Sequence, residues 1–239
     1  MFTLPHFIWL GAISVAVATA LILTKKLNVS HVAVERATAA ILLVLKIFHL
    51  SLSMKASEHG GMVINQTQLS FHLCSIMIYA AILINFIRNE KIVSALKSFM
   101  APCMLLGAAM ALIIPTEGVD VLRPRVWQFM LIHGALVFYG FYLALVERVD
   151  MSIKAYLNNL KLLVVVVVAG FLMNSVLEQY ATNFLFLREP PMSGLPMLNL
   201  DNGWFVYFLC LAAVACILMF LVHLPFIVYG AIKKRISSK

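Results

Sequence analysis

Seven long apolar runs are the feature of this sequence that most limits how the chain can fold. Each run is at least as long as the roughly 17–25 residues that a helix needs to cross a bilayer, and the last one is longer. The backbone must satisfy its own hydrogen bonds inside lipid, and the runs are too long and continuous for barrel strands, so we expect helices. The runs cover residues 5–24, 33–54, 67–88, 98–115, 124–146, 157–178 and 203–231.

The composition agrees with a membrane protein, because 63% of the residues are hydrophobic and only 12% are charged. A soluble domain has roughly 45–50% apolar residues. We therefore predict an all-α, polytopic integral membrane protein with about seven transmembrane helices, forming one domain over residues 1–239. The net charge of +8 does not indicate nucleic-acid binding, because the basic residues lie in the short segments between the runs. The bilayer itself is the partner that we expect.

The basic residues divide unevenly between the two ends of the predicted helices, thirteen against four. Cytoplasmic loops of membrane proteins carry an excess of lysine and arginine. We therefore place the N-terminus outside and the C-terminus in the cytoplasm, in a multi-pass protein of the plasma membrane. The larger group consists of Lys25, Lys26, Arg36, Arg88, Lys91, Lys97, Arg148, Lys154, Lys161, Lys233, Lys234, Arg235 and Lys239. The smaller group consists of Lys55, Arg123, Arg125 and Arg188.

This orientation gives a depth to the polar residues within the runs. At ~1.5 Å per helical residue, Cys74 lies ~10 Å and His133 ~13 Å below the outer surface. His49, on a run that leads outward, lies ~9 Å from the same surface. A histidine inside a membrane helix is rare and tends to face inward and to have a partner. For His133 and His49, a structural hydrogen bond and a functional role are both open.

Three further polar residues approach the same outer side. Asn174 lies near the end of the sixth run, and Asn183 and Arg188 lie in the loop that follows it. The planar guanidinium of Arg188 suits a phosphate or a carboxylate. The alternative for Arg188 is a loop ion pair with Glu178 or Glu189, which would contribute little to stability.

Packing roles are the alternative for most of the other unusual side chains. Lone cysteines in helices are usually small packing residues, and we interpret Cys103, Cys210 and Cys216 in this way. The sequence lacks spacing such as HxxxH, so we expect no metal site and no cofactor. Two ionisable residues within the second run, Glu35 and Lys46, are expected to extend to the membrane surface or to form an interhelical pair. His6 and His223, near the ends of runs, are expected at the membrane interface.

Cys74 differs from the other cysteines because His72 lies two residues before it and His133 lies at matching depth. A thiol can act as a nucleophile when a neighbouring histidine accepts its proton. Residues two apart on a helix are separated by about 200° and do not face each other. If residues 72–74 are helical, His133 is the better base for Cys74, and His72 would orient a second group or the substrate.

Several ordered motifs now carry a resemblance to a known family. They are "HLC" at 72–74, "GAAMALIIPTEG" at 107–118, "FMLIHG" at 129–134, "TNFLFLREPP" at 182–191 and "GWFVYF" at 203–208. In order and spacing they resemble YwaF-type bacterial membrane proteins and their animal relative, transmembrane protein 164. The likeness covers roughly residues 66–210. The chain differs from the family's usual sequence at Leu69-Ser70-Phe71, where Leu-Pro-Leu is common.

The resemblance implies acyl chemistry on membrane phospholipids. The animal relative is understood as a phospholipid acyltransferase that carries a fatty acyl group as a cysteine thioester and requires a histidine. Matched by motif, the nucleophile is Cys74 and the histidine is His133. The oxyanion of the reaction needs hydrogen-bond donors, and Asn183, Asn174 or His72 could supply them.

Other functions remain open on the sequence alone. A lipid hydrolase could use the same pair of Cys74 and His133, with water as the acceptor. A transporter would need inverted repeats, discontinuous helices or charges along a midplane path, and the sequence shows no repeat. A membrane sensor or scaffold would need neither side chain for lipid chemistry.

Overall fold

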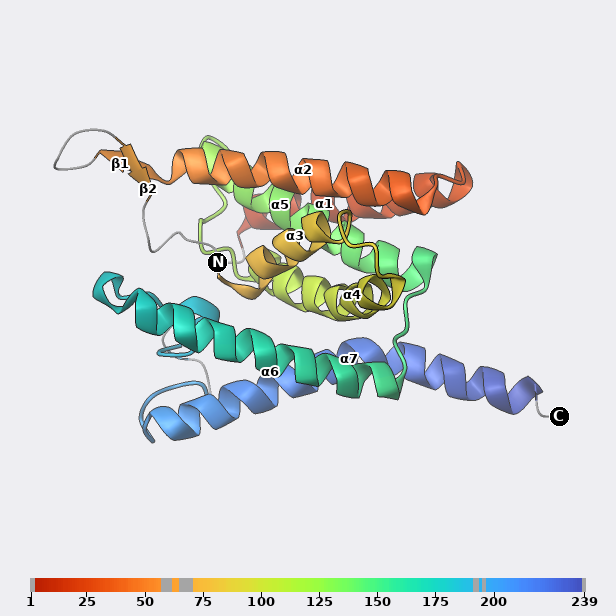
Figure 1. Ribbon diagram of the computed structural model, residues 1–239. Helices are drawn as coiled ribbons and strands as arrows, with labels where there is room; N and C mark the ends of the chain where they lie inside the picture. Colours follow the sequence, from red (N-terminus) through yellow and green to blue (C-terminus); the bar gives the residue numbers. More distant parts are fainter. Residues whose placement is uncertain (1–2, 57–61, 65–70, 191–193, 195–196, 238–239) are drawn as a thin grey trace. The chain divides into compact units, whose positions relative to one another are not determined.

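The protein is almost entirely helical in its computed structural model, which describes residues 3–56, 62–64, 71–190, 194 and 197–237. The long helices are α1 (Leu4–Lys26), α2 (His31–Leu52), α3 (Leu73–Leu83), α4 (Glu90–Ile113), α5 (Pro124–Phe141), α6 (Ile153–Val176) and α7 (Trp204–Ser237) (Figure 1). The short elements are a π-helix, η2 (Tyr142–Glu147), two 3₁₀ turns, η3 (Glu178–Tyr180) and η4 (Phe184–Phe186), and an antiparallel pair of strands, β1 (Met54–Ala56) and β2 (Met62–Ile64). Apart from this hairpin, the described residues confirm the all-α prediction.

Within the described residues, five helices are long and apolar enough to cross a membrane: α1, α4, α5 with η2, α6 and α7. Helix α2 has 22 residues, but each of its 18-residue stretches contains the three charged residues Glu35, Arg36 and Lys46. These helices make the chain a multi-pass membrane protein by length and composition.

Helix α3 is shorter than the membrane-spanning helix predicted over residues 67–88. It has 11 residues, or ~16 Å at ~1.5 Å per residue, about half of a bilayer core. The side-chain amide of Asn85 donates to the carbonyl of Ala81 at 3.0 Å, so a side chain rather than a further helical turn satisfies this carbonyl. Cys74 is the second residue of α3 and His72 precedes the helix. The depth measured along a helix from residue 67 is therefore wrong, and the 200° separation does not apply.

Side-chain caps account for where several helices begin. The carboxamide oxygen of Asn89 accepts hydrogen bonds from the backbone nitrogens of Lys91 and Ile92, at 3.0 and 3.3 Å. Ser30 and Ser152 cap α2 and α6 through their hydroxyl oxygens. Asn and Ser are preferred at this position because they satisfy amide groups that lack an intrahelical partner.

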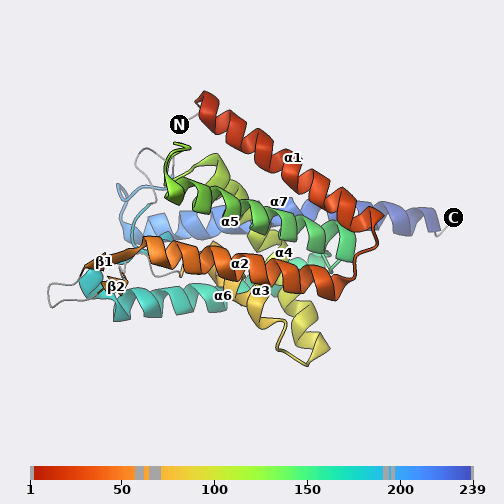
Figure 2. The same ribbon diagram turned by 90° about the horizontal axis from the view of Figure 1, so that it is seen from above.

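The chain forms two compact units, one of residues 1–65 and 73–150 and one of residues 66–72 and 151–239. That residues 1–239 act as one domain stays a prediction. In the first unit, α5 packs against α1, α2 and α4, and α3 packs against α2 and α4 (Figure 2). In the most apolar 18-residue stretches of α4 and of α5 with η2, 56% and 50% of the residues are buried, against 6% for α1. These two helices therefore form the core of the first unit.

A buried ion cluster joins three elements of the first unit. The ammonium of Lys97 on α4 pairs with the carboxylates of Glu35 on α2 and Glu147 on η2, the second at 2.6 Å. Glu35 thus forms an interhelical pair, one of the two alternatives expected for it. Lys97, one of the basic residues assigned to the cytoplasmic side, is only 8% exposed. Its charge is neutralised inside the bundle.

Two histidines expected at the membrane interface are fully buried in the protein. In the first unit, His6 Nε2 donates to the backbone carbonyl of Leu112 at 2.8 Å. In the second unit, His223 Nδ1 donates to the carbonyl of Met151 at 3.1 Å and its Nε2 lies 3.3 Å from the amide of Asn159. Polar partners offset the cost of burying each ring.

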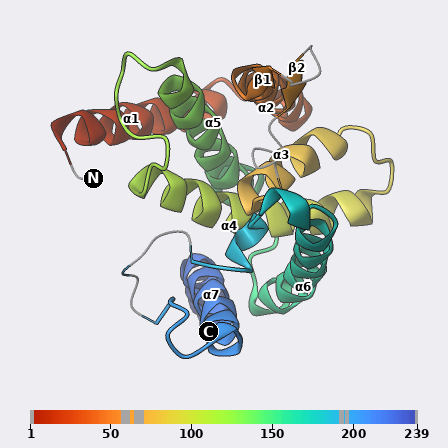
Figure 3. The ribbon, with the colours of Figure 1, turned by 90° about the vertical axis from the view of Figure 1, so that its left-hand side faces the viewer.

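In the second unit, α6 packs against both α7 and η4, and Figure 3 shows α6 and α7 side by side. Gly170 on α6 lets the following loop approach closely, because a Cβ there would lie 2.7 Å from Leu185 Cδ1. The loop carries left-handed backbone at Leu185 and Phe186, with φ of 58° and 56°. The loop is therefore held against α6 rather than extended from it.

Candidate functional site

Cys74 lies near the start of α3 with its thiol against α4. The side chain is partly exposed, and a Cβ placed on Gly107 of α4 would lie 2.9 Å from Cys74 Sγ. No real Cβ is accommodated at such a distance unless the sulfur moves. Glycine at position 107 therefore makes the space that the thiol occupies.

A second thiol belongs to the same face of α4. Cys103 precedes Gly107 by one helical turn and is fully buried, as expected of a packing residue. It lies within electrostatic range of Cys74. All four cysteines of the chain are free thiols. The accessible one of this pair is Cys74.

The tautomer of His133 follows from its hydrogen bond to the backbone. His133 Nδ1 lies 2.7 Å from the carbonyl oxygen of Phe129, four residues earlier on α5. A carbonyl only accepts, so Nδ1 carries the hydrogen and the neutral ring keeps a lone pair on Nε2. Among the described residues, Nε2 has no hydrogen-bond partner. His133 is therefore oriented as a base that would act through Nε2.

The packing of α4 on α5 fixes how the two helices are aligned. Gly140 of α5 lies against Leu105 of α4, and Met130 of α5 shares a cluster with Leu112 of α4. The helices are thus antiparallel. Gly107, between Leu105 and Leu112, lies level with the stretch of α5 within about one turn of His133.

Cys74 and His133 are consequently at similar heights along α4, on elements that both pack against it. Helices α3 and α5 also touch each other directly. In the part of the chain that the structure describes, no hydrogen bond joins the two side chains. The arrangement places a thiol and a basic nitrogen in one region of the first unit.

His49 lies beside this region, on α2. Its Nδ1 is 3.3 Å from the carboxamide oxygen of Gln128 on α5, and the Gln128 amide donates to the carbonyl of Leu45 at 3.4 Å. Gln128 is 3% exposed and therefore links α2 to α5 within the core. Both His49 and the buried Lys46 lie within electrostatic range of His133. His49 and Lys46 of α2 therefore lie in the neighbourhood of His133.

An apolar groove runs along the same pair of helices. Its volume is about 510 Å³, and its lining is Ala40, Ile41, Val44, Leu45, Leu131 and Ala135. Leu131 and Ala135 are each two residues from His133, so their side chains lie about 200° around α5 from it. This volume lies within the ~300–1,000 Å³ typical of ligand pockets. An aliphatic chain would meet only aliphatic side chains here.

The remaining predicted site residues belong to the second unit. His72 packs its ring near those of Phe184 and Phe186, at centroid distances of 5.8 and 5.1 Å. Asn174 is 1% exposed, and its carboxamide pairs with the backbone of Phe184. It accepts from the Phe184 nitrogen at 2.8 Å and donates to the Phe184 oxygen at 3.1 Å. Asn174 therefore fastens the loop to α6.

Asn183 and Arg188 organise the same loop. The Asn183 oxygen accepts from the backbone nitrogen of Arg188 at 3.0 Å, and its amide donates to the carbonyl of Glu189 at 2.8 Å. The Arg188 guanidinium donates to the carbonyl of Asn174 at 2.9 Å and lies 3.5 Å from Glu178. The expected ion pair with Glu178 is thus present, with a carboxylate that is 77% exposed. Leu69, Ser70 and Pro191 of the quoted motifs lie outside the described residues.

Two residues of this region were not singled out from the sequence. Gly107 opens the stretch "GAAMALIIPTEG", and such small residues are the signal of close helix packing in membranes. Gln128 is a polar residue in an apolar run, which is the signal of a buried hydrogen bond. Among the residues that the structure describes, no three His, Cys, Asp or Glu side chains are grouped as a metal ion would require.

Comparison with known proteins gives one match. The sequence profile described as the TMEM164 family matches residues 1–223. No curated protein and no solved structure matches the chain. The matched residues include Cys74, His49 and His133, and the match confirms the resemblance seen in the motifs. A match of this extent shows that the chain belongs to the TMEM164 family.

Proposed function

We propose that this membrane protein is a phospholipid acyltransferase that works through a thioester on Cys74 with His133 as its base. The observation that carries the proposal is the pair of functional groups at one height in the first unit. A partly exposed thiol lies in a slot that Gly107 leaves open, and a histidine is fixed by Phe129 with Nε2 as its lone-pair nitrogen. Family membership supports the same chemistry.

The proposed setting is the plasma membrane, with about seven spans, the N-terminus outside and the C-terminus in the cytoplasm. The uneven distribution of basic residues supports this orientation. A phospholipid of the outer leaflet would approach laterally and lay one acyl chain in the groove between α2 and α5. That groove is lined only by aliphatic side chains.

In the first half-reaction, the thiol of Cys74 attacks the ester carbonyl carbon of the donor lipid while His133 Nε2 accepts the thiol proton. The tetrahedral intermediate collapses by breaking the bond to the ester oxygen. His133 returns the proton to that oxygen, so that the lysophospholipid leaves with a free hydroxyl. The acyl group remains on Cys74 as a thioester.

In the second half-reaction, the hydroxyl of a lysophospholipid acceptor attacks the thioester and gives its proton to His133. The bond to Cys74 Sγ breaks, the acyl group forms a new ester, and the thiolate takes the proton back. Water in place of the acceptor would release a fatty acid, which is the alternative of a hydrolase on the same pair.

The oxyanion of each half-reaction needs hydrogen-bond donors. Asn174 and Asn183 each use one amide hydrogen on the loop backbone, which leaves one hydrogen on each amide. His72 and Arg188 remain candidates for the substrate phosphate or oxyanion. His49 is proposed to support His133 across the α2–α5 contact.

The test uses the purified full chain in nanodiscs with a donor phospholipid labelled in its acyl chain and a lysophospholipid acceptor. Transfer of label, detected by mass spectrometry, should fall at least about 10³-fold in Cys74→Ser. In His133→Asn the side-chain amide can still donate to the Phe129 carbonyl, yet it has no basic nitrogen. Its rate should fall by about 10²–10⁴. Cys210→Ser is the matched thiol control.

The intact protein should carry an acyl adduct that maps to Cys74 and is removed by hydroxylamine. Release of labelled fatty acid alone would identify a hydrolase. Full transfer activity in Cys74→Ser would refute the assignment of Cys74 as the nucleophile. If neither Cys74→Ser nor His133→Asn altered any lipid product, a sensor, scaffold or transporter would replace the enzyme.

A further inference from the structure

A second cavity, of about 630 Å³, lies at the end of the first unit that holds the Lys97 ion cluster. It is lined by residues of α2, of α4 and the turn before α4, and of the end of η2, and some of these side chains are aliphatic. The cavity is separated from Cys74 by the length of α3. The chemistry proposed above makes no use of it.

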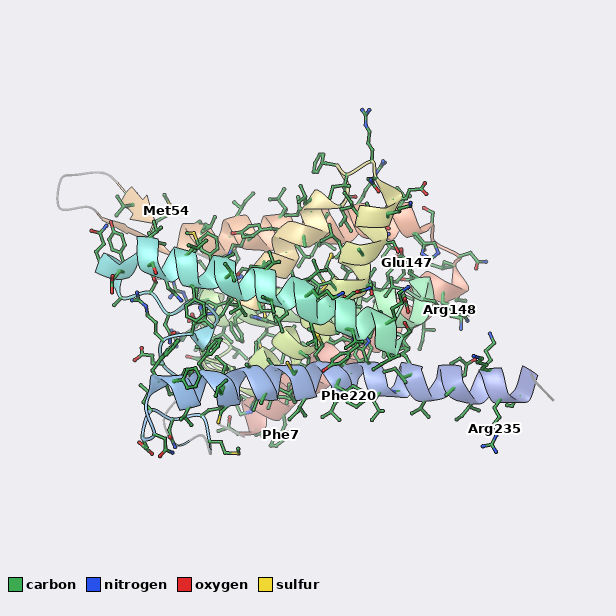
Figure 4. The ribbon with its side chains drawn as sticks, turned by 60° about the horizontal axis from the view of Figure 1, so that its bottom comes forward. Phe7, Met54, Glu147, Arg148, Phe220 and Arg235 are labelled. Carbon is green, nitrogen blue, oxygen red and sulfur yellow. The ribbon has the colours of Figure 1, made fainter. Side chains whose placement is uncertain are left out.

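Three arginines from three different elements line the cavity: Arg36 on α2, Arg88 just before α4, and Arg148 just after η2. All three are exposed, and none forms an ion pair among the described residues. Arg148 has left-handed backbone, with φ of 60°, a conformation that is uncommon for a residue with a side chain. Figure 4 shows Arg148 next to Glu147, where the helix of α5 and η2 ends.

The ion cluster supplies carboxylates, which are hydrogen-bond acceptors, to the same cavity. Lys97 is held by Glu35 and Glu147, and all three line the cavity. One ammonium between two carboxylates leaves one net negative charge. Glu147 Oε2 is buried and has no hydrogen-bond partner in the described part of the chain. The cavity therefore contains an acceptor that a donor could satisfy.

The charges of the whole lining balance. With Glu90 and Asp150, four carboxylates face four cations, so a purely anionic or purely cationic ligand would be poorly matched. The guanidinium fork fits the oxygens of a phosphate, and the free oxygen of Glu147 fits an ammonium or a hydroxyl. The balance favours a ligand that carries both kinds of group.

We propose that this cavity binds a phosphate ester that also carries a hydrogen-bond donor, such as an ammonium group. The arginines would hold the phosphate, and Glu147 would accept from the donor. The ester is either the head group of a lipid in the adjacent leaflet or a water-soluble molecule. The site is independent of Cys74, and it stands whether or not the acyltransferase proposal does.

The test measures binding to the purified full chain in maltoside micelles, which contain no phosphate. O-phosphoethanolamine is the soluble probe, and dihexanoyl-phosphatidylethanolamine is the lipid probe. The double variant Arg88→Gln/Arg148→Gln should bind at least about tenfold more weakly than the wild type, as expected for lost charge-assisted hydrogen bonds. Lys91→Gln/Lys154→Gln removes the same charge from exposed positions outside the cavity and should bind like the wild type.

Binding of both probes supports recognition of the shared head-group chemistry, while binding of one probe alone supports the lipid or the soluble source. Methyl phosphate, which lacks the donor, should bind more weakly than O-phosphoethanolamine. Saturable binding of neither probe would overturn the proposal, and so would equal losses in the two double variants. If the arginine double variant fails to fold, the single exposed change Arg36→Gln replaces it. This variant should then also bind the probes at least about tenfold more weakly than the wild type.

Discussion

Replacing Lys97 by methionine tests whether the buried ion cluster holds α2, α4 and η2 together. The Lys97, Glu35 and Glu147 side chains are only 10%, 12% and 17% exposed. Both carboxylates contact one nitrogen, so they lie at most about 5 Å apart. At an effective dielectric constant of about 20, two unit charges at that distance repel by about 3 kcal/mol. Loss of one partner of a buried pair costs about 3–5 kcal/mol, so we expect a destabilisation in this range.

The measurement is unfolding in mixed micelles titrated with SDS, followed by circular dichroism. The triple variant Glu35→Gln/Lys97→Met/Glu147→Gln keeps the side-chain volumes nearly constant and removes all three charges. It should recover most of the lost stability, because replacing a whole buried ion cluster is often neutral. Wild-type stability in Lys97→Met would refute this reasoning. So would a triple variant as unstable as the single one.

Two further predictions test the packing around the candidate site and the loop of the second unit. Gly107→Ala should leave the free energy of unfolding nearly unchanged, because the Cys74 thiol can rotate away, yet it should slow alkylation of Cys74 by a maleimide and lower acyl transfer. The control for Gly107→Ala is Gly11→Ala, which has open space around it. Unaltered Cys74 reactivity in Gly107→Ala would contradict the close contact between Gly107 and the thiol. Asn174→Ala should destabilise the second unit by about 2–4 kcal/mol, because two buried backbone groups of the loop lose their partner. Thermal unfolding measures the change against Asn158→Ala, an exposed position on the same helix, and equal effects would contradict the loop-fastening role.

The sequence predicted a helix well wherever the apolar run and the helix have the same length. The runs 124–146 and 157–178 correspond to Pro124–Glu147 and Ile153–Val176. Hydropathy reports composition, however, and not which backbone groups are bonded. The apolar residues after Leu83 lie in a turn, so a run of membrane length contained a helix of half that length. The hydrogen bond from Asn85 that accompanies this ending depends on local geometry that apolar periodicity does not record.

The candidate site was predictable only where it depends on a single element. The spacing between Phe129 and His133 on one helix already allows the bond that sets the tautomer. The contact of Cys74 with Gly107 depends on how α3 lies on α4, and the link from Gln128 to His49 depends on how α5 lies on α2. Neither arrangement has a counterpart in local spacing. For the same reason the burial of His6 and His223 was missed, since backbone carbonyls distant in sequence satisfy both rings.

The π-helical turn explains why Glu147 in particular escaped prediction as a partner of Lys97. A π-helix bonds each residue to the fifth along the chain instead of the fourth, so each turn holds more residues. Side chains beyond Phe141 are thereby rotated relative to the α-helical phase that sequence periodicity assumes. This rotation brings Glu147 to Lys97 and leaves Arg148 as the residue that caps η2. π-segments are often found at functional positions, and this one contributes to both the ion cluster and the arginine-lined cavity. Disturbing the π-turn should therefore alter the stability of the first unit and phosphate-ester binding together. The acyl transfer proposed for Cys74 should change little, because it involves the other end of α3.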